Sequence, residues 1–277
     1  MIRNNNHYKP LVEYGRMVHV KLTGEDLEDI TLHKRAEEIW GKELIRPLNG
    51  ENLFVAAIYA LLSARENVPH LNFMMNELKR NGIITPQDIR QQEEAVKLIV
   101  PGDKARFMKK MSNWWEQKNL SKRIIEDYNG PRINAVNFRE EFKEGRTGLG
   151  NKCSSLFLRM VGYEDIAPID IWAIRYLRDK GYNVFNPDKN DMSGATKRRA
   201  PKPMPFQRKF GFFEKTKSMR RYYQTAPTDN EYRKYESWLA KEGRNYGFSV
   251  AKFQCLLWAK YSTWKLGKPD EKQIKLF

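Results

Sequence analysis

The chain has 277 residues, of which 40% are hydrophobic and 12% aromatic, a composition that predicts a globular protein with a substantial core. Its 50 lysine and arginine residues outnumber 34 acidic residues, and the formal net charge of +16 favours a polyanionic partner, above all nucleic acid. Two cysteines and four scattered histidines exclude a disulfide framework, a four-thiolate cluster and the common metal sites, so we expect neither metal nor cofactor.

The first half of the chain shows apolar residues at helical spacing. Residues 29–42 carry Leu32, Ala36 and Ile39 at intervals typical of one helix face. Residues 53–62, LFVAAIYALL, are apolar nearly all round and predict a helix buried at the centre of a helical domain. Further helices are expected at residues 70–80, from Pro86 behind a Thr85 cap, and at residues 103–117.

The second half continues in the same way after a turn at residues 129–131. We expect helical segments at residues 136–142 and 151–161, another beginning near residue 170, and two more at 229–242 and 249–261. No repeat of solenoid length is present. The sequence therefore predicts a mainly α fold.

A tight loop at residues 145–150 joins two of these helices and contains Gly148 and Gly150. Glycines allow the backbone to approach a ligand closely, and the helix that follows directs its free amides and positive dipole end to the same place. This geometry suits a DNA phosphate and reads no base sequence. An ordinary connection between two helices is the alternative interpretation.

Two residues with reactive side chains follow the loop, Lys152 on the first turn of the next helix and Asp170 eighteen residues later. A lysine amine can act as a nucleophile, and a carboxylate can stabilise a developing positive charge. Most lysines are ordinary surface residues, and an aspartate before Ile-Trp-Ala-Ile is a good helix N-cap. A capping carboxylate that faces a pocket can still take part in chemistry, so the interpretations are compatible.

Three segments in this order, GLGNK (148–152), CSSLFLR (153–159) and VGYEDIAPID (161–170), resemble the signature of the helix-hairpin-helix DNA glycosylase superfamily. The resemblance is strongest to the archaeal and bacterial 8-oxoguanine DNA glycosylase/AP lyases. LFVAAIYALLSARENV (53–68), PGDKARFMKKM (101–111) and GFSVAKFQCLLWAKYSTWK (247–265) are similar to further helices of that superfamily.

The resemblance implies a single glycosylase unit over residues 1–277, with an active-site cleft between two lobes. Lobe one would comprise approximately residues 50–130; lobe two would comprise approximately 1–49 and 131–277, including the hairpin 145–150 and a basic insertion at 189–221. The implied catalytic residues are Lys152 and Asp170. The implied DNA contacts are Arg146, Gly148, Leu149, Gly150, Arg65 and Asn67, and the implied base pocket comprises Trp258, Gln254, Phe253 and Cys153.

The implied activity is removal of a flipped, oxidised guanine from duplex DNA through a Schiff base on Lys152, followed by β-elimination at the abasic site. The chain departs from the family at two positions: Trp172 replaces a frequent histidine, and Gln254 replaces an acidic residue. The change at position 254 leaves the identity of the excised base undetermined. Oxidised pyrimidine or mispaired adenine are alternative substrates. A non-catalytic DNA-binding protein and an RNA-binding module are alternative classes.

The segment 189–221 holds eleven basic and two acidic residues, a net charge of +9, with aromatic residues interleaved. This segment could bind the phosphate backbone of a nucleic acid, and a disordered, solvated loop is an equally weighted alternative. The polar N-terminus and the absence of any membrane-length apolar stretch predict no membrane partner. The resemblance implies damaged double-stranded DNA as the partner, and we expect a monomer because the sequence gives no reason to expect an oligomer. We expect it in the cytoplasm of a prokaryote or the nucleus of a eukaryote.

Overall fold

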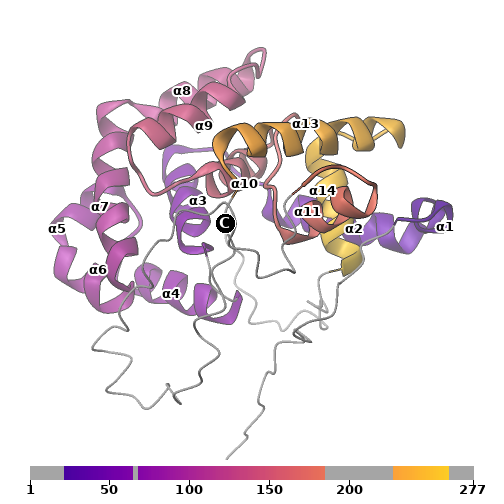
Figure 1. Cartoon of the computed structure of the whole chain (residues 1–277). Coiled ribbons are helices and arrows are strands. Elements are labelled where there is room, and N and C mark those ends of the chain that lie inside the picture. Colours follow the sequence, from indigo (N-terminus) through magenta and orange to yellow (C-terminus); the bar gives the residue numbers. More distant parts are fainter. Residues whose placement is uncertain (1–21, 65–67, 185–226, 262–277) are drawn as a thin grey trace, which may run out of the picture.

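The computed structural model describes residues 22–64, 68–184 and 227–261, and within these ranges the chain forms helices and no β-strand (Figure 1). The prediction of a mainly α fold is confirmed. The first helices in chain order are α1 (Gly24–Glu28), α2 (Ile30–Glu43), α3 (Gly50–Leu62), α4 (Val68–Arg80), α5 (Pro86–Gln91), α6 (Glu93–Ile99) and α7 (Gly102–Gln117). The remaining helices are α8 (Leu120–Asn129), α9 (Ala135–Glu144), α10 (Asn151–Val161), α11 (Ile171–Asp179), α13 (Asp229–Asn245) and α14 (Val250–Tyr261).

Helix α3 is the centre of a first hydrophobic core, as its uniformly apolar sequence predicts. Nearly all its side chains from Leu53 to Leu62 are buried, and α4, α7, α8 and α10 pack against it. Helices α5, α6 and α9 contribute further side chains to the same core. An aromatic cluster ties four of these helices together: the Trp115 ring of α7 contacts Phe54 of α3, Phe142 of α9 and Phe157 of α10 at centroid distances of 5.3, 6.1 and 5.7 Å. Aromatic contacts of this kind add to the free energy gained by burial alone.

A second core is formed by α2, α11, α13 and α14. In Figure 1, α2, α11 and α14 lie on the opposite side of α10 from α5, α6 and α7. The predicted apolar face of α2 is buried here, with Leu32, Ala36 and Ile39 each less than a tenth exposed. After α10, the buried side chains change from the first core to the second between Ile166 and Ala167. This change comes later in the chain than residue 130, where the first lobe was expected to end. The helices α9 and α10 therefore pack with the first core, and the division of the chain into two lobes stays a prediction.

The two cores are joined by a buried ion pair between α9 and α13. The Arg139 side chain is 1% exposed, and its Nη1 donates to both Glu236 carboxylate oxygens at 2.9 and 2.7 Å and to Ser155 Oγ at 3.2 Å. Burial raises the pKa of Glu236, and the neighbouring guanidinium opposes that shift. Because water cannot replace either partner here, the ion pair fixes the position of α13 against α9.

The same helix α13 holds the loop that leads into α11. The Ala167 amide donates to Glu236 Oε1 at 3.1 Å, and the Ile169 amide donates to the Tyr232 hydroxyl at 2.9 Å. That hydroxyl in turn donates to the Ala167 carbonyl at 3.0 Å. The backbone immediately before Asp170 is therefore held at three points by two side chains of α13.

The ion pair between α9 and α13 predicts a large loss of stability when one partner is removed. Arg139→Met leaves a buried carboxylate without its cation and should lower the free energy of unfolding by about 3–5 kcal/mol, measured by urea denaturation. The control is Arg80→Ala, which removes an exposed i,i+3 pair with Glu77 and should change that free energy by less than about 0.5 kcal/mol. Equal effects of the two substitutions would contradict the proposed importance of the buried pair.

Candidate functional site

The loop between α9 and α10 is packed on one side against the first core. The Thr147 hydroxyl donates to the Phe142 carbonyl at 2.7 Å and accepts from the Leu149 amide at 3.2 Å, which closes the loop on itself. Gly148 has a φ of +87°, and a Cβ at this position would lie 2.6 Å from Phe107 of α7. Only glycine fits this combination of a left-handed backbone and a close approach.

The other side of the same loop faces solvent. Gly150 is the N-cap of α10, with no side chain capping the helix from that position, and a Cβ there would meet no atom within 4 Å. Arg146 and Lys152 are exposed beside it. An uncapped helix N-terminus flanked by two cations is electrostatically suited to an anion such as a phosphate.

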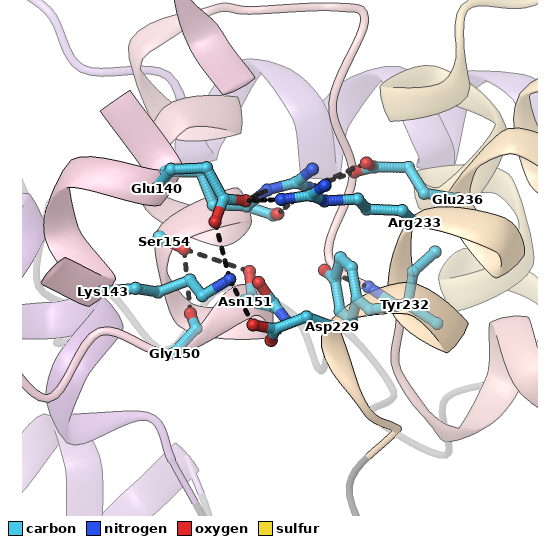
Figure 2. A network of polar contacts seen from close by, with 12 residues as sticks. Glu140, Lys143, Gly150, Asn151, Ser154, Asp229, Tyr232, Arg233 and Glu236 are labelled. Carbon is cyan, nitrogen blue, oxygen red and sulfur yellow. Dashed lines mark hydrogen bonds and ion pairs between the residues drawn. The ribbon is translucent and has the colours of Figure 1, made fainter. Parts of the chain in front are cut away.

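Both ends of the loop are tied to the first residue of α13 (Figure 2). The Asn151 side chain donates to Asp229 Oδ1 at 2.8 Å, and Lys143 at the end of α9 lies 2.8 Å from Asp229 Oδ2. Hydrogen bonds from Lys143 and Asn151 lower the pKa of the Asp229 carboxyl. No local signal in the sequence predicts this contact, because Asp229 lies 78 residues after Asn151 and its neighbours indicate only the start of a helix.

Asp170 is the N-cap of α11, as its sequence context predicts, and it is 8% exposed. Its Oδ1 accepts from the amides of Trp172 and Ala173 at 3.0 and 2.9 Å. Its Oδ2 accepts from the Gln254 side-chain amide at 3.0 Å. Both carboxylate oxygens are therefore held by donors from the protein, which fixes the plane of the carboxylate.

Gln254 lies between Asp170 and a buried arginine. Arg159 of α10 is 4% exposed, and its Nη1 donates to Gln254 Oε1 and to Cys255 Sγ, the latter at 3.3 Å. The resemblance implied that Gln254 lies beside the substrate base, and Arg159 was not among the predicted site residues. The signal was present, because an arginine within the apolar run LFLRMV of a helix requires a buried partner.

The other three residues expected in a base pocket lie in different surroundings. Phe253 is fully buried between the rings of Tyr176 and Tyr246, and so offers a base no exposed face. Trp258 is half-buried at the second core. Cys153 is buried in the first core beside Ser63, and burial raises the pKa of its thiol.

Two predicted DNA contacts, Arg65 and Asn67, lie outside the described residues, as does the basic segment 189–221. A cavity of about 240 Å³ opens beside Trp115 and Ser121, and no candidate site residue lines it. Among the residues that the structure describes, no group of three or more His, Cys, Asp and Glu side chains is placed to hold a metal ion. None of the described helices is long and apolar enough to cross a membrane.

A family model described as 8-oxoguanine DNA glycosylase matches residues 33–198, which is more than half of the chain. The matched range includes the loop between α9 and α10, Lys152 and Asp170, and it ends before α13 and α14. No curated protein shows a significant match to the chain.

Alanine at the two loop glycines should affect stability to very different extents. Gly148→Ala introduces both a left-handed alanine and a clash with Phe107, and should lower the free energy of unfolding by about 2–4 kcal/mol. Gly150→Ala adds a methyl group to open space at a negative φ, and should leave the unfolding midpoint in urea nearly unchanged. A stable Gly148→Ala variant would contradict the close packing of the loop on α7.

Proposed function

Because the chain belongs to the 8-oxoguanine DNA glycosylase family, we propose that it excises 8-oxoguanine from duplex DNA and then cleaves the strand as an AP lyase. Lys152 is the proposed nucleophile, and Asp170 is its proposed carboxylate partner. The observation that carries this proposal is that the family match includes the α9–α10 loop, Lys152 and Asp170 within one continuous range.

The loop between α9 and α10 is the proposed phosphate-binding hairpin. Its exposed side combines Gly150, the uncapped N-terminus of α10 and the Arg146 side chain. Backbone amides and a cation bind phosphate without regard to base sequence, which suits an enzyme that must act at any position in a genome. The packed side, with Gly148 against α7, makes this surface rigid before DNA arrives.

The proposed reaction begins after the damaged nucleotide has left the base stack. The unprotonated amine of Lys152 attacks C1′ of the sugar, the glycosidic bond breaks, and its electron pair leaves with the base, which takes up a proton. Opening of the sugar ring yields a Schiff base between Lys152 and C1′. Loss of a proton from C2′ then expels the 3′ phosphate and cleaves the strand.

Asp170 is proposed to stabilise the positive charge that develops on the sugar as the glycosidic bond breaks. Support comes from its surroundings: the carboxylate is buried, and three N–H donors hold it in one orientation. A charge that is already oriented requires no reorganisation during the reaction. The proposal requires the Lys152 amine and this carboxylate to reach the same nucleoside.

The half-buried Trp258 of α14 stays the proposed surface on which the flipped base stacks. A base stacked on an aromatic ring gains about 1–3 kcal/mol, which holds the base without choosing it. Arg65 and Asn67 stay proposed DNA contacts beside the gap that the base leaves. The proposed partner is damaged double-stranded DNA, bound by a monomer.

Borohydride trapping tests the role of Lys152. Reduction of the Schiff base should join the protein covalently to a duplex containing 8-oxoguanine, and gel electrophoresis should show the complex. Lys152→Gln removes the amine and should abolish the complex, while Lys122→Gln, which changes an exposed lysine on α8, should leave it intact. Trapping only with an oxidised pyrimidine or with adenine opposite 8-oxoguanine would identify a different substrate. No trapping with any of these duplexes, despite DNA binding, would contradict the proposed chemistry.

Substitution of Asp170 separates its chemical role from its capping role. Asparagine caps helices as well as aspartate does, so Asp170→Asn should keep α11 and fold, although it loses the hydrogen bond that Gln254 donates to Oδ2. Loss of the negative charge should lower the single-turnover rate of base release roughly 100-fold, with the Kd for DNA unchanged. The matched control is Asp29→Asn at the N-cap of α2, which accepts from two backbone amides in the same way and should leave the rate unchanged.

A further inference from the structure

We propose that Gln254 is a positioning residue for Asp170, and that Arg159 in turn orients Gln254. The three side chains form a chain of hydrogen bonds that we call the Arg159 relay, from the guanidinium through the amide to the carboxylate. This inference rests on the catalytic role proposed for Asp170. It gives Gln254 a different function from reading the edge of the substrate base.

The chemistry of the relay allows only one orientation of the amide. The Gln254 oxygen accepts from a guanidinium, which can only donate, and its nitrogen donates to Asp170 Oδ2. Rotating the amide by 180° would place an NH₂ group against the guanidinium and an oxygen against the carboxylate. Both contacts would then be repulsive, so Arg159 determines which end of Gln254 faces Asp170.

Burial makes this arrangement rigid. Asp170, Gln254 and Arg159 are 8%, 2% and 4% exposed. Hydrogen bonds to charged groups are strong where water does not compete, and they polarise one another along a chain. With Oδ1 held by two amides of α11, the relay supplies the second constraint that the carboxylate needs to keep one orientation.

The relay also ties Asp170 to the helix that carries the proposed nucleophile. Arg159 follows Lys152 by seven residues in α10, which is close to two helical turns, so the two residues share one side of the helix. Their Cα atoms are separated by about 10 Å along the axis. Gln254 therefore connects the side of α10 that bears Lys152 with the first turn of α11.

Base reading by Gln254 fits the same contacts poorly. Its oxygen and its nitrogen are both engaged within the protein, and its side chain is almost fully enclosed. Contact with a base would require both the guanidinium and the carboxylate to lose a buried partner. Glutamine at this position is therefore explained by the hydrogen bond that it donates to Asp170, and not by contact with a base.

Gln254→Met keeps the length of the side chain but removes both hydrogen bonds. Single-turnover base release from an 8-oxoguanine duplex, measured at saturating protein, should slow at least tenfold, while the Kd for the duplex changes less than twofold. The control is Tyr182→Phe, which removes one hydrogen bond to Glu242 in the second core and should leave the rate unchanged. A normal rate for Gln254→Met, or an equal loss in Tyr182→Phe, would overturn the proposal.

A double-mutant cycle distinguishes positioning from general damage to the fold. If Gln254 acts through Asp170, adding Gln254→Met to Asp170→Asn should slow base release less than twofold further. A further tenfold loss would overturn the relay.

Arg159→Met provides a second variant if Gln254→Met fails to fold. It should have the same effects as Gln254→Met, both in the wild-type protein and in Asp170→Asn. If Asp170→Asn slows base release and Gln254→Met does not, the relay is overturned and the proposed function stands. If Asp170→Asn releases the base at the normal rate, both the relay and the proposed function are overturned.

Discussion

The buried ion pair between Arg139 and Glu236 is the contact on which the rest of the site depends. It is a buried contact between the first core, through α9, and the second core, through α13. Glu236 uses the same carboxylate to hold the Ala167 amide, and Tyr232 one turn earlier holds Ile169. A single helix thereby sets the distance between the cores and the course of the backbone that delivers Asp170.

The candidate site is assembled from both cores, with polar contacts between them. The loop after α9 and the first turn of α10 belong to the first core, and Asp170 belongs to the start of a helix in the second. Asp229 fastens the loop, and the Arg159 relay fastens the carboxylate. Such contacts have strict geometry, whereas apolar side chains tolerate small shifts, so polar contacts suit a site in which two elements must keep their relative position.

Local signals in the sequence were sufficient to predict much of the fold. The apolar run of α3, the Thr85–Pro86 start of α5 and the bounds of α10 follow from composition and capping, which act within one helix. Helices α6 and α8 were missed, since each begins directly after another helix. Asn119, in the left-handed region at a φ of +51°, separates α7 from α8 without a glycine or proline to mark the break.

The partners of the site residues were less accessible to prediction. The N-cap position of Asp170 was evident from its neighbours, but the contact with Gln254 joins residues 84 positions apart, and Arg159 meets Gln254 across 95. Such pairings depend on how helices pack, which propensity and spacing do not encode. Phe253 and Gln254 illustrate the difference: both lie on a helix that was predicted, and the packing of α14 directs both inward.

The coupling of Gln254 to Arg159 limits how this scaffold can be re-engineered. A chimera that receives the last helix of another glycosylase, in order to accept a new base, would bring an unmatched side chain to position 254. A carboxylate there could accept from the guanidinium but would repel the Asp170 carboxylate, and an apolar residue would remove the hydrogen bonds to both groups. Positions 159 and 254 must therefore be exchanged together, even though 95 residues separate them in the chain.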